Sequence, residues 1–196
     1  MKKERFSLFE EYKNSWKFLK ESRNFIYGVI YVFIFFAIIG FFFPAPQFIV
    51  DRIRAFVESL IKQLENKTLI GVILFIFFNN LKSSFMGLIF GFILGVPSMI
   101  IVIFNGYLVG FISSVSVRSS GIFSLWKLFP HGIFELPAIF ISLGLGVKIG
   151  SFIFQRQGKK SLKHFLINSL KIFILIVIPL LLIAAIIEGV LIFILK

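Results

Sequence analysis

The amino-acid sequence predicts an all-α polytopic membrane protein, a transmembrane helical bundle of about five spans with one or two amphipathic interfacial helices. Hydrophobic residues make up 58% of the 196 positions and charged residues only 15%, whereas a soluble domain carries about 25% charged residues. The apolar residues gather in runs that reach the length of about 20 residues needed to cross a hydrocarbon layer ~30 Å thick. The basic residues, which give a net charge of +12, flank these runs.

This distribution of charge indicates the partners. Lys and Arg beside apolar runs are typical of membrane topology and of attraction to anionic headgroups. We therefore expect the lipid bilayer as the surroundings and no nucleic acid as a partner. The chain contains no cysteine, which excludes disulfides and thiolate metal ligands.

Residues 1–24 form a charged N-terminal segment with seven Lys or Arg residues. Its apolar residues recur at steps of three and four, which places them on one helical face. They are Phe6, Phe9, Tyr12, Trp16 and Leu19. We expect a cytoplasmic amphipathic helix that lies on the membrane surface and leads into the first span. A partner-binding helix is the alternative.

The transmembrane domain, residues 25–196, begins with a span at 25–43 that ends before Pro44, because proline cannot continue a helix. An external amphipathic helix is predicted at 48–65, with an apolar stripe on one side and charges on the other. The second span is predicted at 69–94, although its apolar start is too short to cross alone. One helix with a polar patch inside it is preferred here to a re-entrant pair.

The remaining spans are predicted at 98–117, 132–154 and 166–195, with a basic loop at 155–164. This loop carries four Lys or Arg residues and lies on the same side as the N-terminal segment in a chain of five spans. Basic residues favour the cytoplasmic side. We therefore expect a multi-pass protein of the cell membrane whose N-terminus is cytoplasmic and whose C-terminus is external.

Small residues spaced by four occur on three of the spans, and such a face lets another helix backbone approach closely. The predicted helix-packing residues are Ser83, Gly87, Gly91, Gly95, Gly106, Gly110, Ala138, Ser142, Gly146 and Gly150. They pack the helices of one chain together or form a subunit interface. Because five helices need fewer such faces among themselves, we expect a homodimer.

Polar residues inside the spans form a predicted buried cluster: Asn79, Asn80, Lys82, Asn105, His131, Glu135 and Glu188. An unpaired charge at mid-bilayer costs at least ~3 kcal/mol. Lys82 lies about 20 Å from the outer end of its helix at 1.5 Å per residue, so we expect Glu135 or Glu188 to neutralise it. The cluster is then either a structural ion pair or the lining of a pathway for ions or small solutes.

We expect neither metal binding nor catalysis at this cluster. His131 and Glu135 share a helical face, as two metal ligands would, but the other histidine, His164, falls in the predicted cytoplasmic loop. Two ligands are too few, so we expect no metal and no cofactor. No serine lies in a nucleophile elbow, so a hydrolase is not expected and the protein is predicted to be no enzyme.

Three motifs follow one another between residues 70 and 155. They are Phe78-Asn79-Asn80, Phe104-Asn105-Gly106 and the string Pro130-His131-Gly132-Ile133-Phe134-Glu135-Leu136-Pro137-Ala138. In their order and rough spacing they resemble the stage II sporulation protein M family. The resemblance implies a multi-span membrane protein without assigned catalysis, and the family's namesake works with peptidoglycan-degrading proteins during engulfment as their membrane anchor.

Relatives in that family also occur in organisms that form no spores, archaea included. The resemblance and the small-residue faces together favour a non-enzymatic membrane scaffold or anchor for membrane or cell-envelope protein partners. A transporter or channel for ions or small solutes, which would use the buried polar cluster, is the alternative.

Overall fold

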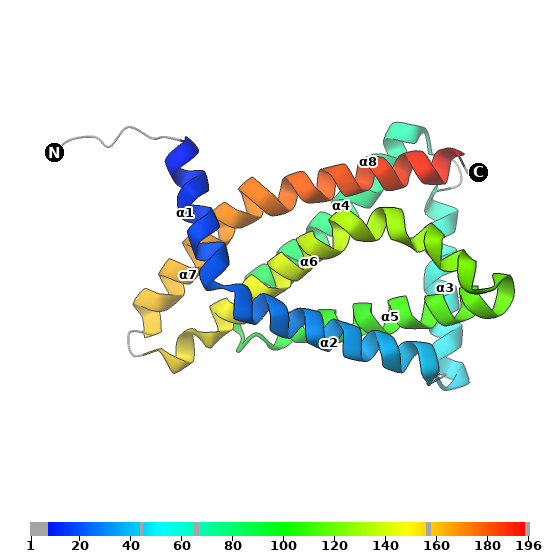
Figure 1. Cartoon of the computed structure of the whole chain (residues 1–196), viewed down its shortest axis with the longest axis horizontal. Coiled ribbons are helices and arrows are strands. Elements are labelled where there is room, and N and C mark those ends of the chain that lie inside the picture. The colour runs from blue at the N-terminus through cyan, green and yellow to red at the C-terminus, as the bar shows by residue number, and fades with distance from the viewer. Residues whose placement is uncertain (1–7, 44, 65–66, 156–157, 195–196) are drawn as a thin grey trace.

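The computed structural model describes residues 8–43, 45–64, 67–155 and 158–194, and of these the side chains at 8, 57, 61 and 126–131 fall outside the description. Throughout the described ranges the elements are helical and no strand occurs, which confirms the predicted all-α fold (Figure 1). Within these ranges, five helical stretches are long and apolar enough to cross a membrane: Arg23–Phe42, Leu69–Phe92, Val96–Ser120, Gly132–Phe154 and Gly158–Ile194.

The elements in chain order are α1 (Leu8–Glu21), α2 (Arg23–Phe42), α3 (Gln47–Leu64), α4 (Leu69–Ile89), η1 (Phe90–Phe92), α5 (Val96–Ser120), η2 (Ile122–Leu128), α6 (Phe129–Gly150), η3 (Ser151–Phe154), α7 (Gly158–Ile172), η4 (Phe173–Val177) and α8 (Ile178–Ile194). The segments η1, η2 and η3 are 3₁₀-helical, and η4 is a π-helical turn. Because α7, η4 and α8 follow without a break, the last span begins at Gly158, earlier than the predicted 166.

Two amphipathic helices cross opposite ends of the bundle. In Figure 1, α1 lies steeply to the long axis at the end where α7 starts, and α3 does so at the end where α8 finishes. An amphipathic helix in this orientation lies in the plane of the membrane surface when the bundle spans the bilayer. On α1 the aromatic residues Phe9, Tyr12 and Trp16 are exposed, while Phe18 is buried.

The second span is one helical rod from Leu69 to Phe92 rather than a re-entrant pair. Polar side chains in its middle leave the backbone hydrogen-bond ladder intact. The chain then reverses at Leu94 and Gly95, whose φ angles are 54° and 72°. This left-handed conformation favours glycine at position 95.

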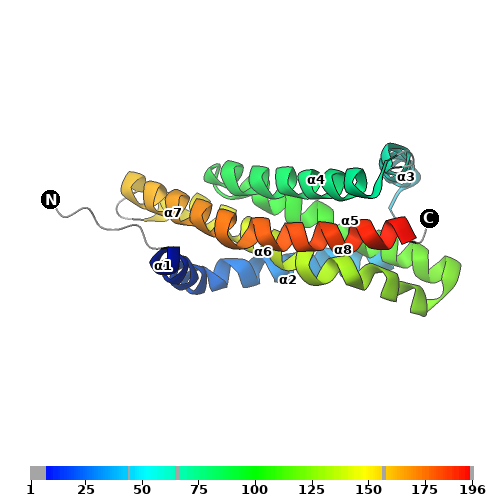
Figure 2. The ribbon, with the colours of Figure 1, turned by 90° about the horizontal axis from the view of Figure 1, so that it is seen from above.

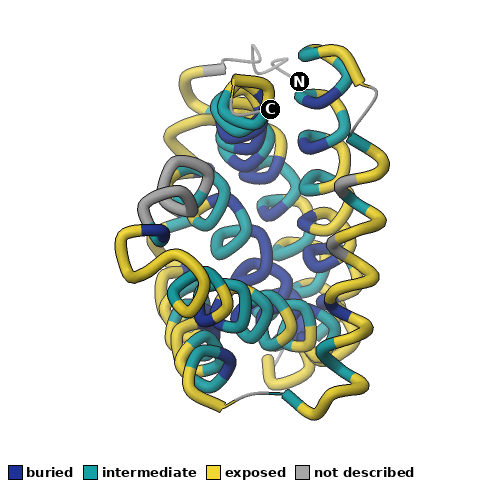
Figure 3. The backbone as a smooth tube through the Cα atoms, turned by 90° about the vertical axis from the view of Figure 1, so that its right-hand side faces the viewer, coloured by how far each residue is buried: buried dark blue, intermediate teal, exposed yellow. Residues whose placement is uncertain are grey.

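α6 lies at the centre of the bundle and packs against α2, α4 and α8. Half of its most apolar stretch is buried, against 17–33% of the other four spans. Figure 3 shows the buried segments gathered between the helices and the exposed ones around the outside. The outer surfaces of the other spans are therefore available to lipid or to a partner.

α4 and α6 meet backbone to backbone. A Cβ atom built on Gly146 of α6 would lie 2.5 Å from the carbonyl oxygen of Gly87 of α4. Just beyond α4, one built on Gly91 of η1 would collide with the backbone of Gly146, and one built on Gly150 would collide with the backbone nitrogen of Gly95. Ser142 Oγ donates a hydrogen bond of 2.7 Å to the carbonyl oxygen of Ser84. Small residues and hydroxyl donors of this kind stabilise helix pairs in lipid, where a hydrophobic driving force between helices is missing.

α2 and α5 form the second close pair. A Cβ atom on Gly106 would lie 2.6 Å from the carbonyl oxygen of Phe33, and one on Gly110 would collide with that of Ala37. From the α2 side, a Cβ atom on Gly40 would collide with the carbonyl oxygen of Tyr107. Except at Ser83, which is exposed, the predicted helix-packing residues are thus occupied by other parts of the same chain.

We predict that Gly91→Leu destabilises the protein by about 3 kcal/mol, the upper end of the cost of overpacking, because a backbone and not a flexible side chain faces the new atoms. Gly28→Leu is the matched control, since a Cβ at Gly28 meets nothing within 4 Å. Thermal melting of both variants in detergent measures the difference. Equal melting of the two variants would contradict the close approach of η1 and α6.

Candidate functional site

The predicted polar cluster does not form a single site. On α4, Asn79 and Lys82 are exposed and Asn80 is half-buried, whereas Glu135 of α6 and Glu188 of α8 lie inside the bundle. The side chain of Asn105 bonds within its own helix. The Asn105 side-chain nitrogen donates a hydrogen bond of 2.8 Å to the carbonyl oxygen of Ile101. The side chain of His131 lies outside the described residues.

Asn79, Lys82 and Ser83 form what we call the outward polar face of α4, because all three side chains are exposed. α4 lies along one edge of the bundle (Figure 2). Among the described residues, no ion pair or hydrogen bond joins Lys82 to Glu135 or Glu188. The predicted neutralisation of Lys82 inside the chain is therefore wrong.

Helix geometry explains why these residues face outward. Residues spaced by four advance by about 400° at 3.6 residues per turn, so a ladder of fours drifts by about 40° at each step. In this series, Gly87 and Gly91 are buried in the interface with α6. Ser83 and Asn79 are rotated away from that interface and are exposed. Ser84 takes the buried position predicted for Ser83, with a relative exposure of 2%.

Two carboxyl groups lie inside the bundle, in the helices α6 and α8 that pack side by side. Glu135 and Glu188 are both half-buried, and Glu135 lies within range of the charge of Glu188. Within the described part of the chain, Glu188 Oε2 is buried and has no hydrogen-bond partner. No group of three His, Asp or Glu residues gathers among the described side chains.

A third polar site, which the sequence did not suggest, lies where α1 joins α2. Lys148 of α6 is only 6% exposed. Its Nζ donates a hydrogen bond of 2.9 Å to Ser22 Oγ and lies 3.8 Å from the centre of the Phe18 ring. Ser22 Oγ in turn donates to the carbonyl oxygen of Phe18 at 2.6 Å. We call these contacts the elbow latch, because they fix the turn between α1 and α2.

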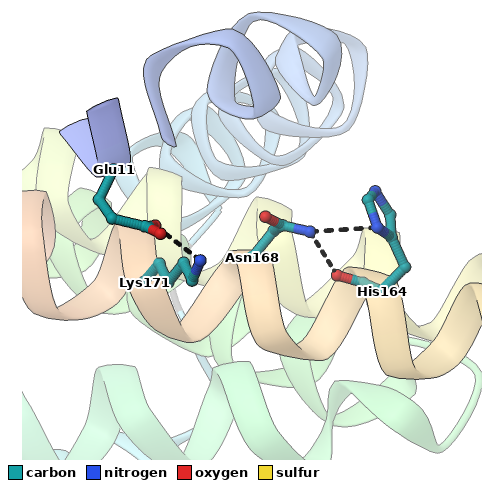
Figure 4. A network of polar contacts seen from close by, with 4 residues as sticks. All are labelled: Glu11, His164, Asn168 and Lys171. Carbon is teal, nitrogen blue, oxygen red and sulfur yellow. Dashed lines mark hydrogen bonds and ion pairs between the residues drawn. The ribbon is translucent and has the colours of Figure 1, made fainter. Parts of the chain in front are cut away.

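An ion pair and an aromatic contact hold the rest of α1 against α7. Lys171 Nζ lies 2.6 Å from Glu11 Oε2. Figure 4 shows the two side chains of this ion pair pointing toward each other. The rings of Phe18 and His164 meet edge to face at 5.7 Å.

Lys148 could not be recognised from the sequence because a lysine two turns from the end of a span usually reaches out to the headgroups. The partner that keeps it buried is more than 100 residues away in the chain.

We predict that Lys148→Met loosens α1, because the methionine fills a similar volume but makes neither the hydrogen bond nor the cation–π contact. A hydrogen bond to a charged group contributes about 1.5–3 kcal/mol, which corresponds to a tenfold or greater rise in opening of α1. Hydrogen exchange of the α1 amides measures this rise. Lys163→Met, an exposed lysine on α7, is the control and should leave the exchange unchanged; unchanged exchange in Lys148→Met would contradict the latch.

Comparison with known proteins identifies the family. The sequence profile of the stage II sporulation protein M family matches residues 29–191. An uncharacterized protein of the archaeon Methanocaldococcus jannaschii is 29% identical over 171 residues, which cover 84% of this chain and 76% of that relative.

A second uncharacterized protein of the same archaeon is 41% identical over 73 residues, which cover 36% of this chain and 41% of that relative. No solved structure matches this chain. The family match extends from the first span into the last, so it includes the central helix α6 and most of each helix packed against it. The chain belongs to the stage II sporulation protein M family.

Proposed function

We propose that the protein is a non-catalytic membrane scaffold that holds a partner membrane protein against the outward polar face of α4. The exposure of Lys82 near the middle of a span supports this most directly. At 1.5 Å per residue, Lys82 is about 20 Å from Leu69 and about 15 Å from Phe92. A lysine at the centre of a transmembrane helix costs about 2.5–3.5 kcal/mol when nothing compensates its charge.

The neighbours of Lys82 on the same face point to a protein as the compensating group. Asn79 and Ser83 lie about one turn from each other and add donors and acceptors that lipid tails cannot satisfy. A transmembrane segment with a carboxylate or amide side chain at this depth would satisfy all three residues. Polar side chains that hydrogen-bond across helices are a usual means of association in lipid.

The interior of the bundle supports a scaffold more than a pore. Backbone contacts at Gly91 and Gly146, and at Gly106 and Gly110, bring the helices as close as two helices can come. A helix interface this close has no room for a file of water or ions. Partner anchoring is also what the family resemblance implies.

The partner is proposed to be a different protein. The exposed acids of the described chain, Glu10, Glu21, Asp51 and Glu58, lie in α1 and α3 at the two ends of the bundle. A second copy docked through α4 would therefore bring two lysines together without a carboxylate at that depth. The homodimer expected from the sequence also loses its motivation, because its small-residue faces pack within the chain.

We predict that a photo-crosslinking amino acid at position 79 captures a second membrane protein in native membranes. Substitution of the exposed Phe104 of α5 by the same amino acid is the control and should capture lipid alone. Because the proposal depends on charge, Lys82→Met should reduce the product at position 79 at least tenfold, and Lys82→Arg should retain it. Equal products with Lys82→Met, or lipid products only, would contradict the scaffold.

A cation pathway is the second candidate, and the proximity of Glu135 and Glu188 favours it. Two carboxyl groups in one apolar site are unfavourable unless they share a proton or a cation. Membrane-embedded acids of this kind line the proton and ion routes of transporters.

The two candidates predict different behaviour in liposomes. As a scaffold, the wild-type protein should hold an imposed pH gradient as long as protein-free liposomes do. As a pathway, it should dissipate the gradient, and Glu135→Gln with Glu188→Gln should abolish the leak. Decay of a pH-sensitive dye inside the liposomes measures both, and a leak that needs the two acids would overturn the scaffold in favour of transport.

The orientation of the bundle in the membrane is proposed from the distribution of its basic residues. α1 and the start of α7 lie at the same end of the bundle (Figure 1). Both are rich in lysine, and basic residues favour the cytoplasmic side. We therefore propose that this end faces the cytoplasm and that α3 and the end of α8 face outward.

A further inference from the structure

A groove opens beside the elbow between α1 and α2. Its volume is about 470 Å³, and its lining residues are Leu19, Lys20, Arg23, Ile26, Tyr27 and Ile141. A second hollow of about 430 Å³ adjoins it, because Lys20 and Arg23 line both. Neither belongs to the outward polar face of α4 or to the acids inside the bundle.

The packing of three helices creates the groove. α2 comes close to α6 at Gly144, where a Cβ atom would lie 2.8 Å from the Cα atom of Ile26. The chain turns at Ser22, and the elbow latch holds that turn through Lys148. α1 therefore leaves in a different direction, and the space between α1, α2 and α6 stays unfilled.

The groove has two chemically different ends. Lys20 and Arg23 are exposed and lie on the α1 side of the turn and at the first residue of α2. Ile26 and Ile141 are half-buried and lie deeper along α2 and α6. A charged end above an apolar end matches the order of a phosphate headgroup above an acyl or isoprenoid chain.

Aromatic residues place this groove at the membrane surface. Tyr12, Trp16 and Tyr27 are all exposed at the same end of the bundle. Tyr and Trp concentrate at the level of the headgroups, where one side of the ring is apolar and the other wet. Lys20 and Arg23 therefore lie where lipid phosphates lie.

We propose that this groove binds one anionic glycerophospholipid, with its phosphate between Lys20 and Arg23 and one chain against Ile26 and Ile141. Arginine donates two parallel hydrogen bonds to a phosphate and lysine adds a point charge. Glu21 lines the adjoining hollow and offsets one charge, but Lys17, Lys20 and Arg23 leave an excess of positive charge there. The apolar end selects a lipid over free phosphate, which would leave it empty.

The site gives α1 a second means of attachment besides the elbow latch. Charge attraction to an anionic leaflet alone would act on every lysine at this end to a similar degree. A site of fixed geometry would instead depend on Lys20 and Arg23 far more than on other lysines. This difference makes the proposal testable and keeps it independent of the scaffold function.

Native mass spectrometry of the full-length protein in detergent tests the site, with phosphatidylglycerol or phosphatidylcholine added at equal concentrations. We expect the wild type to retain phosphatidylglycerol at least fivefold over phosphatidylcholine. Lys20→Gln with Arg23→Gln should lose this preference, whereas Lys159→Gln with Lys160→Gln, which removes the same charge from exposed residues at the start of α7, should keep it. Excess inorganic phosphate should not displace the lipid.

Three results would overturn the proposal. Equal retention of the two lipids would remove the selectivity for anionic headgroups. Loss of the preference in both double variants would mean diffuse attraction without a defined site, and displacement by inorganic phosphate would mean a phosphate site without a lipid. Because all four substituted residues are exposed, melting like that of the wild type verifies that each variant is folded.

Discussion

Helices that touch backbone to backbone decide the arrangement of this protein. α6 packs closely against α4 at Gly146, against the turn after η1 at Gly150 and against α2 at Gly144, because hydrogen replaces a side chain at each contact. In lipid, where burial of apolar surface gives no advantage to one helix pair over another, close packing and hydrogen bonds from serine must supply the specificity. Such contacts allow little rotation about the helix axis, so they also determine which way every other side chain of a helix points.

The directions in which the polar side chains point follow from these close backbone contacts. With Gly87 and Gly91 turned toward α6, Lys82 has to lie on the outer side of α4. Glu135 of the central helix and Glu188 of the adjacent α8 are half-buried and lie inside the bundle. The same bundle thus separates a cation that faces out, on which the proposed scaffold function rests, from acids that face in.

Much of the fold was accessible from the sequence. Runs of apolar residues predict spans because the bilayer fixes their length, and the spacing of small residues predicts that helices approach closely at Gly91, Gly106 and Gly146. Which helices pair with each other could not be predicted from the sequence, since a helix face of small residues can pack against any other such face. The supposed pairing of Lys82 with Glu135 failed for a related reason: spacing along a chain gives depth in the membrane, but the drift of about 40° per four residues gives the facing direction only once the interface is known. Lys148 was missed because its burial depends on Phe18 and Ser22, which arrive from another helix.

The direction of Lys82 is the central claim, and site-directed spin labelling tests it most directly, because the chain has no cysteine to remove. A label at position 82 of the purified protein in lipid vesicles should collide often with oxygen, which concentrates in lipid, and rarely with a water-soluble nickel chelate. That result would place residue 82 on the outside of the bundle, free for a partner. Frequent collision with the nickel chelate would place it in a water-filled interior and would contradict the account.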